Sequence, residues 1–194
     1  MRVRWALKEV GEPYDVRLLT FEELKVRPYR DLHPFGQIPT YQQGQLDLFE
    51  SGAIVFHIAD NHPGLLPEDP ILRARAISWM FSALNTMEPP IVEREMSGYT
   101  EGKKAWYRER LSMLDGRVHV RLGELSTRLG ASDWLDETFT AGDLLMVTVL
   151  RRLEGTGLLE KYPNLVSYVG RAKERPAYKR AYRAQFDVWE RNNR

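Results

Sequence analysis

The sequence has 194 residues, of which 43% are hydrophobic and 28% charged, so it is expected to fold as one large or two small domains and not to be disordered. The formal net charge is +1, which does not indicate strong attraction to nucleic acid or to an anionic membrane. The absence of cysteine excludes a disulfide framework, a thiolate zinc site and a cysteine nucleophile among these residues.

The first predicted element is a helix over residues 2–10, because Val3, Leu7 and Val10 recur on one helical face and Gly11 follows as a stop. The start has neither a long apolar run nor a small-residue cleavage site, so a secretory signal is not predicted. A membrane span needs about 18 consecutive apolar residues, and the sequence has no such run. We therefore expect a cytoplasmic protein without a membrane partner.

Two short elements are predicted after this helix. Val16 and Leu18 give the stretch Tyr14–Leu19 the pattern of a short strand. Residues 22–32 are predicted to form a helix that Pro28 makes irregular, because a proline ring and its missing N–H disturb a helix interior.

A hairpin is predicted next. Residues 35–41 form a turn that leads into an extended segment, and Gln43-Gly44 marks a tight turn between two strands. In the second strand Leu46 and Leu48 are separated by a polar residue, as expected for a strand with one buried face.

A domain boundary is predicted in the middle of the chain. A helix that begins at Ser51 is followed by the most linker-like stretch, residues 60–70, which is rich in proline and glycine. The predicted organisation is a small βα domain over residues 1–62, a linker over residues 63–70 and an all-helical domain over residues 71–194.

Every pattern after the linker is helical. Apolar residues recur at three- and four-residue steps, and the first of these helices is expected to end where Pro89-Pro90 interrupts it. The predicted helical stretches cover residues 72–87, 111–129, 144–150, 165–173 and 176–189.

The helix over residues 144–150 has a well-marked beginning. Thr140 can cap its N-terminus, Asp143 can return the hydrogen bond, and Phe139 with Leu144 can form a hydrophobic staple. Loss of the Thr140 cap is expected to cost about 1 kcal/mol of stability.

The motif Gln37-Ile38-Pro39 stands at the mouth of the first hairpin strand. If the bond before Pro39 is cis, Ile38 turns its backbone N–H and C=O outward and can pair with a short extended peptide. The alternative is an edge-strand proline without a binding role, since proline cannot donate a ladder hydrogen bond. Taken alone, the motif favours that plainer interpretation.

The motif Glu50-Ser51 lies where a strand ends and a helix begins. A helix N-terminus can bind a carboxylate through its free N–H groups and its positive dipole end. The Ser51 hydroxyl adds a donor, and Glu50 offers a negative group to an ammonium, so together they could hold the zwitterionic head of an amino acid. The alternative is an ordinary helix cap beside an acidic residue.

Together the two motifs suit a tripeptide whose first residue is linked through its side chain, which is glutathione. Five stretches in chain order carry a wider likeness. They are Arg2–Tyr14, His33–Pro39, Glu50–Ile54, Phe139–Asp143 and Arg175–Tyr178. On these stretches the chain resembles the cytosolic glutathione transferases of bacterial type over nearly its whole length.

The resemblance implies a fold of two parts, an N-terminal thioredoxin-like βα domain and an all-helical C-terminal glutathione-transferase domain. It implies that Ile38 binds the cysteinyl backbone of glutathione, that Pro39 is cis, and that Glu50 and Ser51 hold the γ-glutamyl end. Gln37 lies where the family often has a polar residue near the glycyl end.

The beginning of the sequence departs from the family pattern. In the family a first strand and a loop precede the first helix, and the loop carries the Ser, Tyr or Cys that contacts the glutathione sulfur. Here only Met1 precedes Arg2, and Tyr14, Thr20 and Tyr29 are poorly placed for that role. The catalytic residue is therefore unknown.

A missing first strand would leave the inner edges of the sheet unpaired, at a cost in unsatisfied N–H and C=O groups. Three alternatives stay open. The true start lies upstream, a partner chain fills the gap, or a rearranged Tyr14–Leu19 strand fills it.

The other residues favour plain interpretations. The four histidines lack metal-ligand spacing, so no metal site is predicted, and a glycine-rich phosphate loop is absent. The basic stretch over residues 171–194 is interpreted as a solvated helix face and not as a nucleic-acid site. The resemblance implies that Thr140 and Asp143 contribute to folding and not to catalysis.

Aromatic and methionine side chains on the helices have two interpretations. They either pack in the core or a dimer interface, or some of them line an apolar pocket for an electrophile. The residues concerned are Trp79, Met80, Phe81, Met87, Trp106 and Tyr107.

The function that the resemblance implies is conjugation of the thiol of glutathione, the co-substrate, to small apolar electrophiles, as in detoxification. The alternative is a catalytically impaired glutathione-transferase-like protein that acts in binding or interaction, which the absent hydroxyl loop favours. A thiol–disulfide enzyme is disfavoured because the chain has no cysteine. The resemblance also implies a homodimer.

Overall fold

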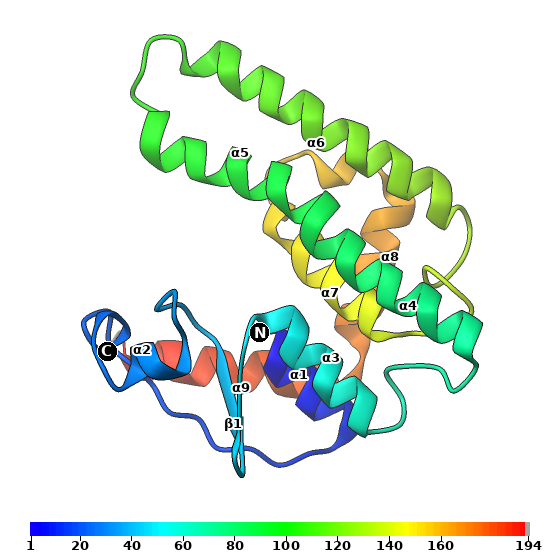
Figure 1. The fold of residues 1–194 in the computed structure, drawn as a ribbon. Coiled ribbons are helices and arrows are strands. Elements are labelled where there is room, and N and C mark those ends of the chain that lie inside the picture. The colour runs from blue at the N-terminus through cyan, green and yellow to red at the C-terminus, as the bar shows by residue number, and fades with distance from the viewer. Residues whose placement is uncertain (193–194) are drawn as a thin grey trace. The chain divides into compact units, whose positions relative to one another are not determined.

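The computed structural model describes residues 1–192 (Figure 1). These residues form two structural units. Unit 1 consists of Met1–Leu66 together with the last helix, α9 (Pro176–Asn192), and unit 2 spans Pro67–Arg175. Unit 1 contains both strands and unit 2 is helical, in agreement with the predicted fold class.

Unit 1 combines one β-hairpin with helices of different lengths. Its elements are α1 (Arg2–Val10), η1 (Glu23–Lys25), α2 (Tyr29–Leu32), β1 (Thr40–Gln43), β2 (Leu46–Phe49), α3 (Ser51–Asn61) and α9. β1 and β2 pair antiparallel, with Thr40 opposite Phe49 and Gln43 opposite Leu46. The predicted hairpin is therefore present, and its turn begins at Gly44.

The buried face of α1 differs from the predicted one. The sequence pattern predicts Val3, Leu7 and Val10 on the inner face, whereas the buried residues are Trp5, Ala6 and Leu7. The reason is that α1 packs against both α3 and α9, so its core-facing surface is set by two neighbours.

The last helix belongs with α1. Trp5 is fully buried and meets the ring of Tyr178 edge-on, with 4.9 Å between ring centroids. Arg4 Nη1 donates a hydrogen bond to the Ala184 carbonyl at 3.3 Å. The structure thus groups α9 with unit 1, whereas the predicted division placed residues 176–194 in the helical domain. Periodicity predicts the helix but does not indicate which neighbour it contacts.

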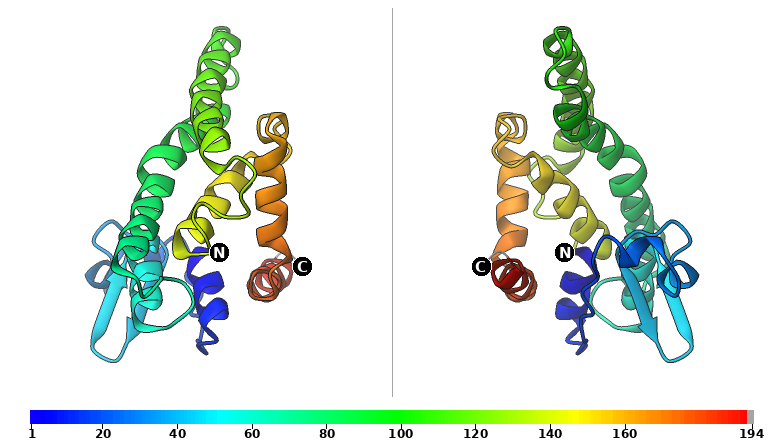
Figure 2. Two further views of the ribbon diagram at one scale, coloured as in Figure 1. Left: turned by 90° about the vertical axis from the view of Figure 1, so that its right-hand side faces the viewer. Right: turned by 90° about the vertical axis from the view of Figure 1, so that its left-hand side faces the viewer.

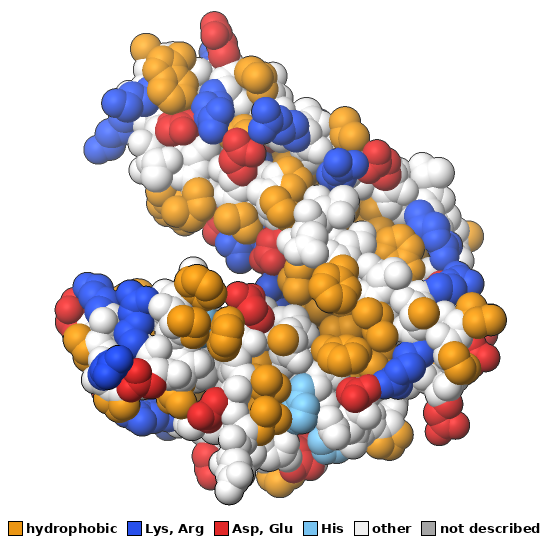
Figure 3. All heavy atoms as spheres, viewed as in Figure 1, with side chains coloured by type: hydrophobic (Ala, Val, Ile, Leu, Met, Phe, Trp, Pro, Cys, Tyr) orange, Lys and Arg blue, Asp and Glu red, His pale blue; other side chains and the backbone are white. Residues whose placement is uncertain are grey.

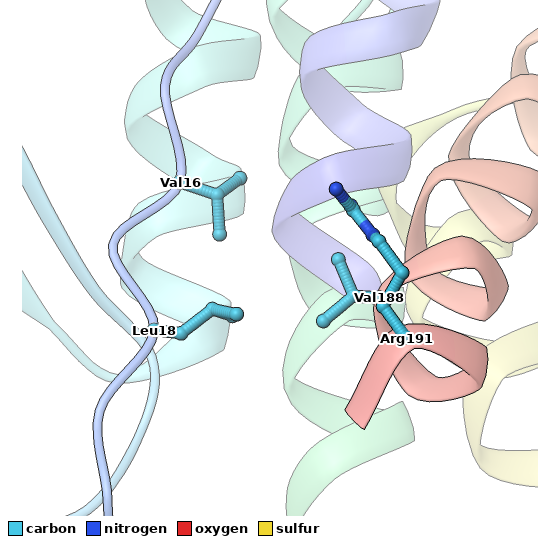
Figure 4. A pocket seen from close by; sticks show the side chains of 4 residues that line it. All are labelled: Val16, Leu18, Val188 and Arg191. Carbon is cyan, nitrogen blue, oxygen red and sulfur yellow. The ribbon is translucent and has the colours of Figure 1, made fainter. Parts of the chain in front are cut away.

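The segment after α1 is extended but forms no strand, so the prediction of a strand over Tyr14–Leu19 is wrong. Val16 and Leu18 are 45% and 54% exposed. They point toward Val188 and Arg191 of α9, and the four side chains line a cavity of about 290 Å³ (Figure 4). A strand needs a neighbour that completes its ladder, and the sheet of the described chain consists of β1 and β2 alone. The alternative in which this segment fills the sheet edge is wrong for the same reason.

Two other expectations concern the ends of helices. The irregular helix predicted over residues 22–32 consists of two short pieces, η1 and α2, separated at Pro28. α3 ends at Asn61 and α4 (Pro70–Ser82) begins at Pro70, so no helix or strand covers residues 62–69, and the linker over residues 63–70 stays a prediction. Asp69 caps α4 by accepting two backbone N–H hydrogen bonds.

Unit 2 is a bundle of helices. Its elements are α4, η2 (Ala83–Met87), α5 (Glu88–Glu101), α6 (Tyr107–Leu129), α7 (Ala141–Leu150), η3 (Arg151–Leu153), η4 (Leu159–Lys161) and α8 (Pro163–Glu174). α5 and α6 run beside each other, and α7 lies between α4 and α8 (Figure 2). α7 is therefore buried on nearly all sides, as its apolar sequence predicts.

The helix end predicted at Pro89-Pro90 does not occur. α4, η2 and α5 follow one another without a break, and η2 is a π-helical turn in which the Glu88 N–H donates to the carbonyl of Ala83. A proline clashes with the carbonyl four residues earlier and gives it no donor, but it is tolerated in the first turn of a helix. The π turn shifts the hydrogen-bond spacing just before the prolines, so the helix continues.

The predicted capping box at the start of α7 is confirmed. Thr140 Oγ1 accepts from the Gly142 N–H at 3.2 Å, and Asp143 Oδ2 accepts from the Thr140 N–H at 2.8 Å. Asp143 Oδ1 also accepts from the Leu135 N–H at 3.0 Å and from the Tyr168 hydroxyl at 2.9 Å. Burial raises the pKa of Asp143, and the hydrogen bonds from Leu135 and Thr140 oppose that rise. The network ties α7 to α8 and to the loop before it.

The six aromatic and methionine side chains singled out in the sequence differ in burial. Met80 and Met87 are buried in the core, Trp79 and Tyr107 are half-buried, and Phe81 and Trp106 are 62% and 48% exposed. Core packing thus accounts for the two methionines but not for Phe81 and Trp106. Within residues 1–192, none of the helices combines the length and the apolar character that crossing a bilayer requires.

Candidate functional site

The loop that leads into β1 presents Ile38 to solvent. Ile38 is 69% exposed, Gln37 is exposed and Pro39 is half-buried. The peptide bond between Ile38 and Pro39 is cis. Figure 3 shows hydrophobic side chains gathered on the face of unit 1 that carries this loop. An exposed isoleucine beside a strand end offers both an apolar contact and backbone groups to a ligand.

Hydrogen bonds to the buried residues Tyr29 and His33 fix the backbone of this loop. Tyr29, which is 6% exposed, donates its hydroxyl to the Gln37 carbonyl at 2.5 Å. His33 is 2% exposed, and its carbonyl accepts from the Gly36 N–H at 2.9 Å. Gly36 has φ +61°, and a Cβ placed there would lie 2.6 Å from the Leu24 carbonyl oxygen. The backbone before Ile38 is thus fixed by packing and hydrogen bonds.

The junction between β2 and α3 contains the second motif. Glu50 has φ 67°, the only positive φ of a non-glycine residue in the described chain, and its side chain is exposed. The first bond of α3 runs from the Ile54 N–H to the Glu50 carbonyl at 3.0 Å. The N–H groups of Ser51 and Gly52 precede that bond and lie at the positive end of the helix dipole. Unfavourable backbone conformations of this kind cluster at ligand sites.

Arg2 reaches the same junction from α1. Its Nη1 donates a hydrogen bond to Ser51 Oγ at 3.0 Å, and both residues are half-buried. No sequence motif predicts Arg2 as a site residue. Local patterns at residues 2–10 indicate an amphipathic helix, and only the packing of α1 against α3 brings Arg2 to the start of α3.

The hairpin brings the two predicted motifs to one place. Thr40 opens β1 and pairs with Phe49, which closes β2, so Pro39 and Glu50 flank the same end of the ladder. The loop with Ile38, the residue Glu50 and the N-terminus of α3 therefore lie at the same end of the two-stranded sheet. Such an arrangement offers backbone pairing, a negative group and a carboxylate-binding helix end within one site.

The hydroxyls considered for catalysis have other contacts. Tyr29 lies beside the loop, but its hydroxyl is bonded to the Gln37 carbonyl. The Tyr14 ring lies under the ammonium of Lys8, with 4.8 Å to its centroid. Thr20 Oγ1 donates to Glu23 at 2.9 Å. Within the described residues, no group of three or more His, Cys, Asp or Glu side chains is arranged to hold a metal ion.

Comparisons with known proteins point to one family. The family model for the glutathione S-transferase N-terminal domain matches residues 1–60. Glutathione S-transferase 1 of Zea mays is 30% identical over 191 residues, covering 91% of this chain and 87% of that protein. A glutathione S-transferase-like protein, OpS6, of Beauveria bassiana is 27% identical and covers 92% of this chain and 87% of that protein.

Solved structures agree with this result. The crystal structure of a glutathione transferase from Burkholderia graminis, with two glutathione molecules bound per subunit, has a TM-score of 0.83 at 26% identity. That match covers 93% of this chain and 81% of the other. The chain belongs to the glutathione transferase family. The family prediction is therefore confirmed, and the assignment to a bacterial type stays a prediction.

Proposed function

We propose that the protein binds glutathione at the end of the β1–β2 hairpin that Ile38, Pro39, Glu50 and Ser51 flank, and conjugates the glutathione thiol to small apolar electrophiles. The observation that carries this proposal is the convergence of the two motifs at one end of the β1–β2 ladder. Bound glutathione in the Burkholderia graminis structure, and in a Pseudomonas fluorescens family member with a TM-score of 0.83 and 25% identity, supports the ligand.

Each part of glutathione has a proposed partner. The backbone of Ile38 pairs with the cysteinyl residue, and Gln37 lies near the glycyl end. Glu50 binds the ammonium of the γ-glutamyl residue. The Ser51 hydroxyl and the free N–H groups at the start of α3 bind its carboxylate.

The reaction joins the sulfur of glutathione to an electrophilic carbon. With a chloro-nitroaromatic substrate, the thiol loses its proton, a C–S bond forms, and chloride leaves with the bonding electrons. A free thiol has a pKa near ~8.5, so a site that lowers this pKa raises the fraction of reactive thiolate at neutral pH. Binding and thiol activation would supply most of the catalysis.

A second candidate is a protein that binds glutathione but turns it over poorly. The contacts of Tyr14, Thr20 and Tyr29 favour it, because each of these side chains has a different interaction within unit 1. Binding and turnover must therefore be measured separately.

Isothermal titration calorimetry with glutathione at millimolar concentration tests binding. We expect heat release and a rise in melting temperature, because a ligand that binds only the folded state stabilises it. Absence of both would overturn the enzyme and the binder alike. If glutathione binds, turnover of 1-chloro-2,4-dinitrobenzene, followed by product absorbance, separates the two candidates.

Ser51→Ala tests the position of the site. The variant loses one hydrogen bond to a charged group, so glutathione binding should weaken by about 1.5–3 kcal/mol. Calorimetry measures the change, and Ser78→Ala is a control, because the Ser78 hydroxyl bonds the Ala74 carbonyl within α4. An unchanged affinity of the Ser51 variant would show that the site is misplaced.

We also propose a cytoplasmic homodimer, as the family resemblance implies. The exposed side chains of Phe81 and Trp106 support an interface that covers apolar surface of unit 2. Sedimentation equilibrium distinguishes a 22.6 kDa monomer from a species of twice that mass.

A further inference from the structure

Arg2 is the cation that contacts the candidate γ-glutamyl site. A guanidinium carries only donors, so in the Arg2–Ser51 hydrogen bond of 3.0 Å the serine oxygen is the acceptor. The hydroxyl hydrogen of Ser51 is then directed away from Arg2. A serine held in this way can donate to a ligand, whereas a free serine hydroxyl samples several rotamers.

The charges around Ser51 are arranged for a zwitterion. Arg2 and the N-terminus of α3 place positive charge beside the serine. Glu50, the residue before it, places a carboxylate nearby and has no ion pair with another described residue. A carboxylate and an ammonium on one carbon atom match these opposite charges.

We propose that Arg2 is a positioning residue for the γ-glutamyl end of glutathione. It holds the Ser51 hydroxyl as a donor toward the α-carboxylate and adds positive charge beside that carboxylate. This inference rests on the proposed function. It adds a residue from α1 to a site otherwise built from the β1–β2 hairpin and α3, and it makes the free α-carboxylate the feature of the ligand that the protein selects.

The experiment compares two ligands by calorimetry. One is glutathione, and the other is 4-aminobutyryl-cysteinyl-glycine, which lacks only the α-carboxylate. Arg2→Met should weaken glutathione about tenfold or more, as expected for loss of a charged donor, and should change the affinity of the other tripeptide by less than about twofold. A general disturbance of the fold would weaken both ligands equally.

Arg4→Met is the matched control. Arg4 lies two residues along the same helix, and its guanidinium bonds the Ala184 carbonyl of α9, away from Ser51. Its loss removes the same charge and the same kind of side chain from α1. We expect the affinity for glutathione to stay within about twofold of the wild-type value.

Two further variants extend the test: Arg2→Lys guards against misfolding of Arg2→Met, and a double variant measures the coupling between Arg2 and Ser51. Arg2→Lys keeps the charge and loses the planar donor geometry, so glutathione should weaken to an intermediate degree while the other tripeptide is unaffected. In the double variant Arg2→Met/Ser51→Ala the loss should be smaller than the sum of the single losses, because Arg2 acts partly through Ser51.

The outcomes separate the two proposals. If the wild-type protein binds no glutathione, the proposed function fails and this inference fails with it. If wild type binds and Arg2→Met keeps its affinity, or if the variants weaken both tripeptides equally, only the inference is overturned. Should Arg2→Met fail to fold, an unchanged ratio of the two affinities in Arg2→Lys overturns it.

Discussion

Asp143 is a single carboxyl group on which several parts of unit 2 depend. It is fully buried and accepts hydrogen bonds from Leu135, Thr140 and Tyr168. Burial is the largest influence on its pKa and raises it, because ionisation of an enclosed carboxyl group loses hydration. Burial and Asp143 also raise the pKa of Tyr168 well above its ordinary value.

Asp143→Asn tests this balance through the pH dependence of stability. Because the folded-state pKa of Asp143 lies above the unfolded-state value, the folded protein holds this proton more tightly. The protonated Asp143 therefore contributes to the free energy of unfolding. This contribution is complete below the unfolded-state pKa, near ~4, and is lost as pH rises through the folded-state pKa. We expect the free energy of unfolding of wild type, minus that of the variant, to fall with rising pH in that window.

Urea unfolding at a series of pH values measures this difference, and the other carboxyl groups cancel because both proteins share them. Above the window the variant should still be less stable by roughly 1–3 kcal/mol. The NH2 group of the asparagine replaces one accepting oxygen, so a buried donor that bonds Asp143 loses its acceptor. A difference that grows with pH would show that the hydrogen bonds outweigh the burial of Asp143.

At the scale of elements, the loop before β1 depends on the conformation of one glycine. Gly36 has a positive φ, and a side chain there would meet the backbone of Leu24 and the guanidinium of Arg30. The loop shape in turn sets the position of Gln37 and Ile38. In this region the sequence predicts one irregular helix over residues 22–32, whereas the structure has two shorter pieces, η1 and α2.

Gly36→Ala should lower both stability and glutathione affinity. Gly44→Ala is a matched control, because Gly44 has the same φ of +61° but no atom within 4 Å of the added methyl group. The conformational cost is about 1–2 kcal/mol for either variant, and only Gly36→Ala adds a steric clash. Thermal unfolding and calorimetry with glutathione measure the two effects. Equal losses of stability in both variants would contradict a specific role for the Gly36 contact.

At the scale of the whole molecule, the last described helix, α9, lies in the same unit as the first helix, α1. α9 contacts α1 through the Trp5–Tyr178 ring pair and through the bond from Arg4 to Ala184. Unit 1 therefore combines segments from both ends of the chain, and the capping network of Asp143 stabilises unit 2 separately.

Truncation after Arg175 tests this division by amide hydrogen exchange. Removal of α9 uncovers Trp5, which is fully buried, so the amides of α1 should lose protection while those of α7 keep it. An internal comparison of these two helices in the same sample controls for general unfolding. Loss of protection in α7 to the same extent would show that the two units do not unfold independently.

Much of the fold could be predicted from the sequence because the signals are local. The capping box at Thr140 and Asp143, the hairpin turn at Gly44 and the apolar run of α7 are each encoded within a few residues. The candidate site was also predicted in part, because the motif around Pro39 and the Glu50-Ser51 pair follow one another at the two ends of a short hairpin.

The incorrect predictions share one physical cause. Tyr14–Leu19 has the composition of a strand, but a strand requires a neighbour, and composition does not reveal whether one is present. The pair Pro89-Pro90 predicts the end of a helix, but the π turn before it changes the hydrogen-bond spacing, and the helix continues. In both places the outcome depends on the surrounding backbone.

The sequence by itself determined the family, the two-part organisation, the capping box and the motifs that could hold glutathione, because these features reside in residue types at short spacing. Only the tertiary structure decided that α9 packs in unit 1 and that Arg2 bonds Ser51. Contacts between residues 49 positions apart follow from helix packing, whose partner and rotation no local pattern specifies.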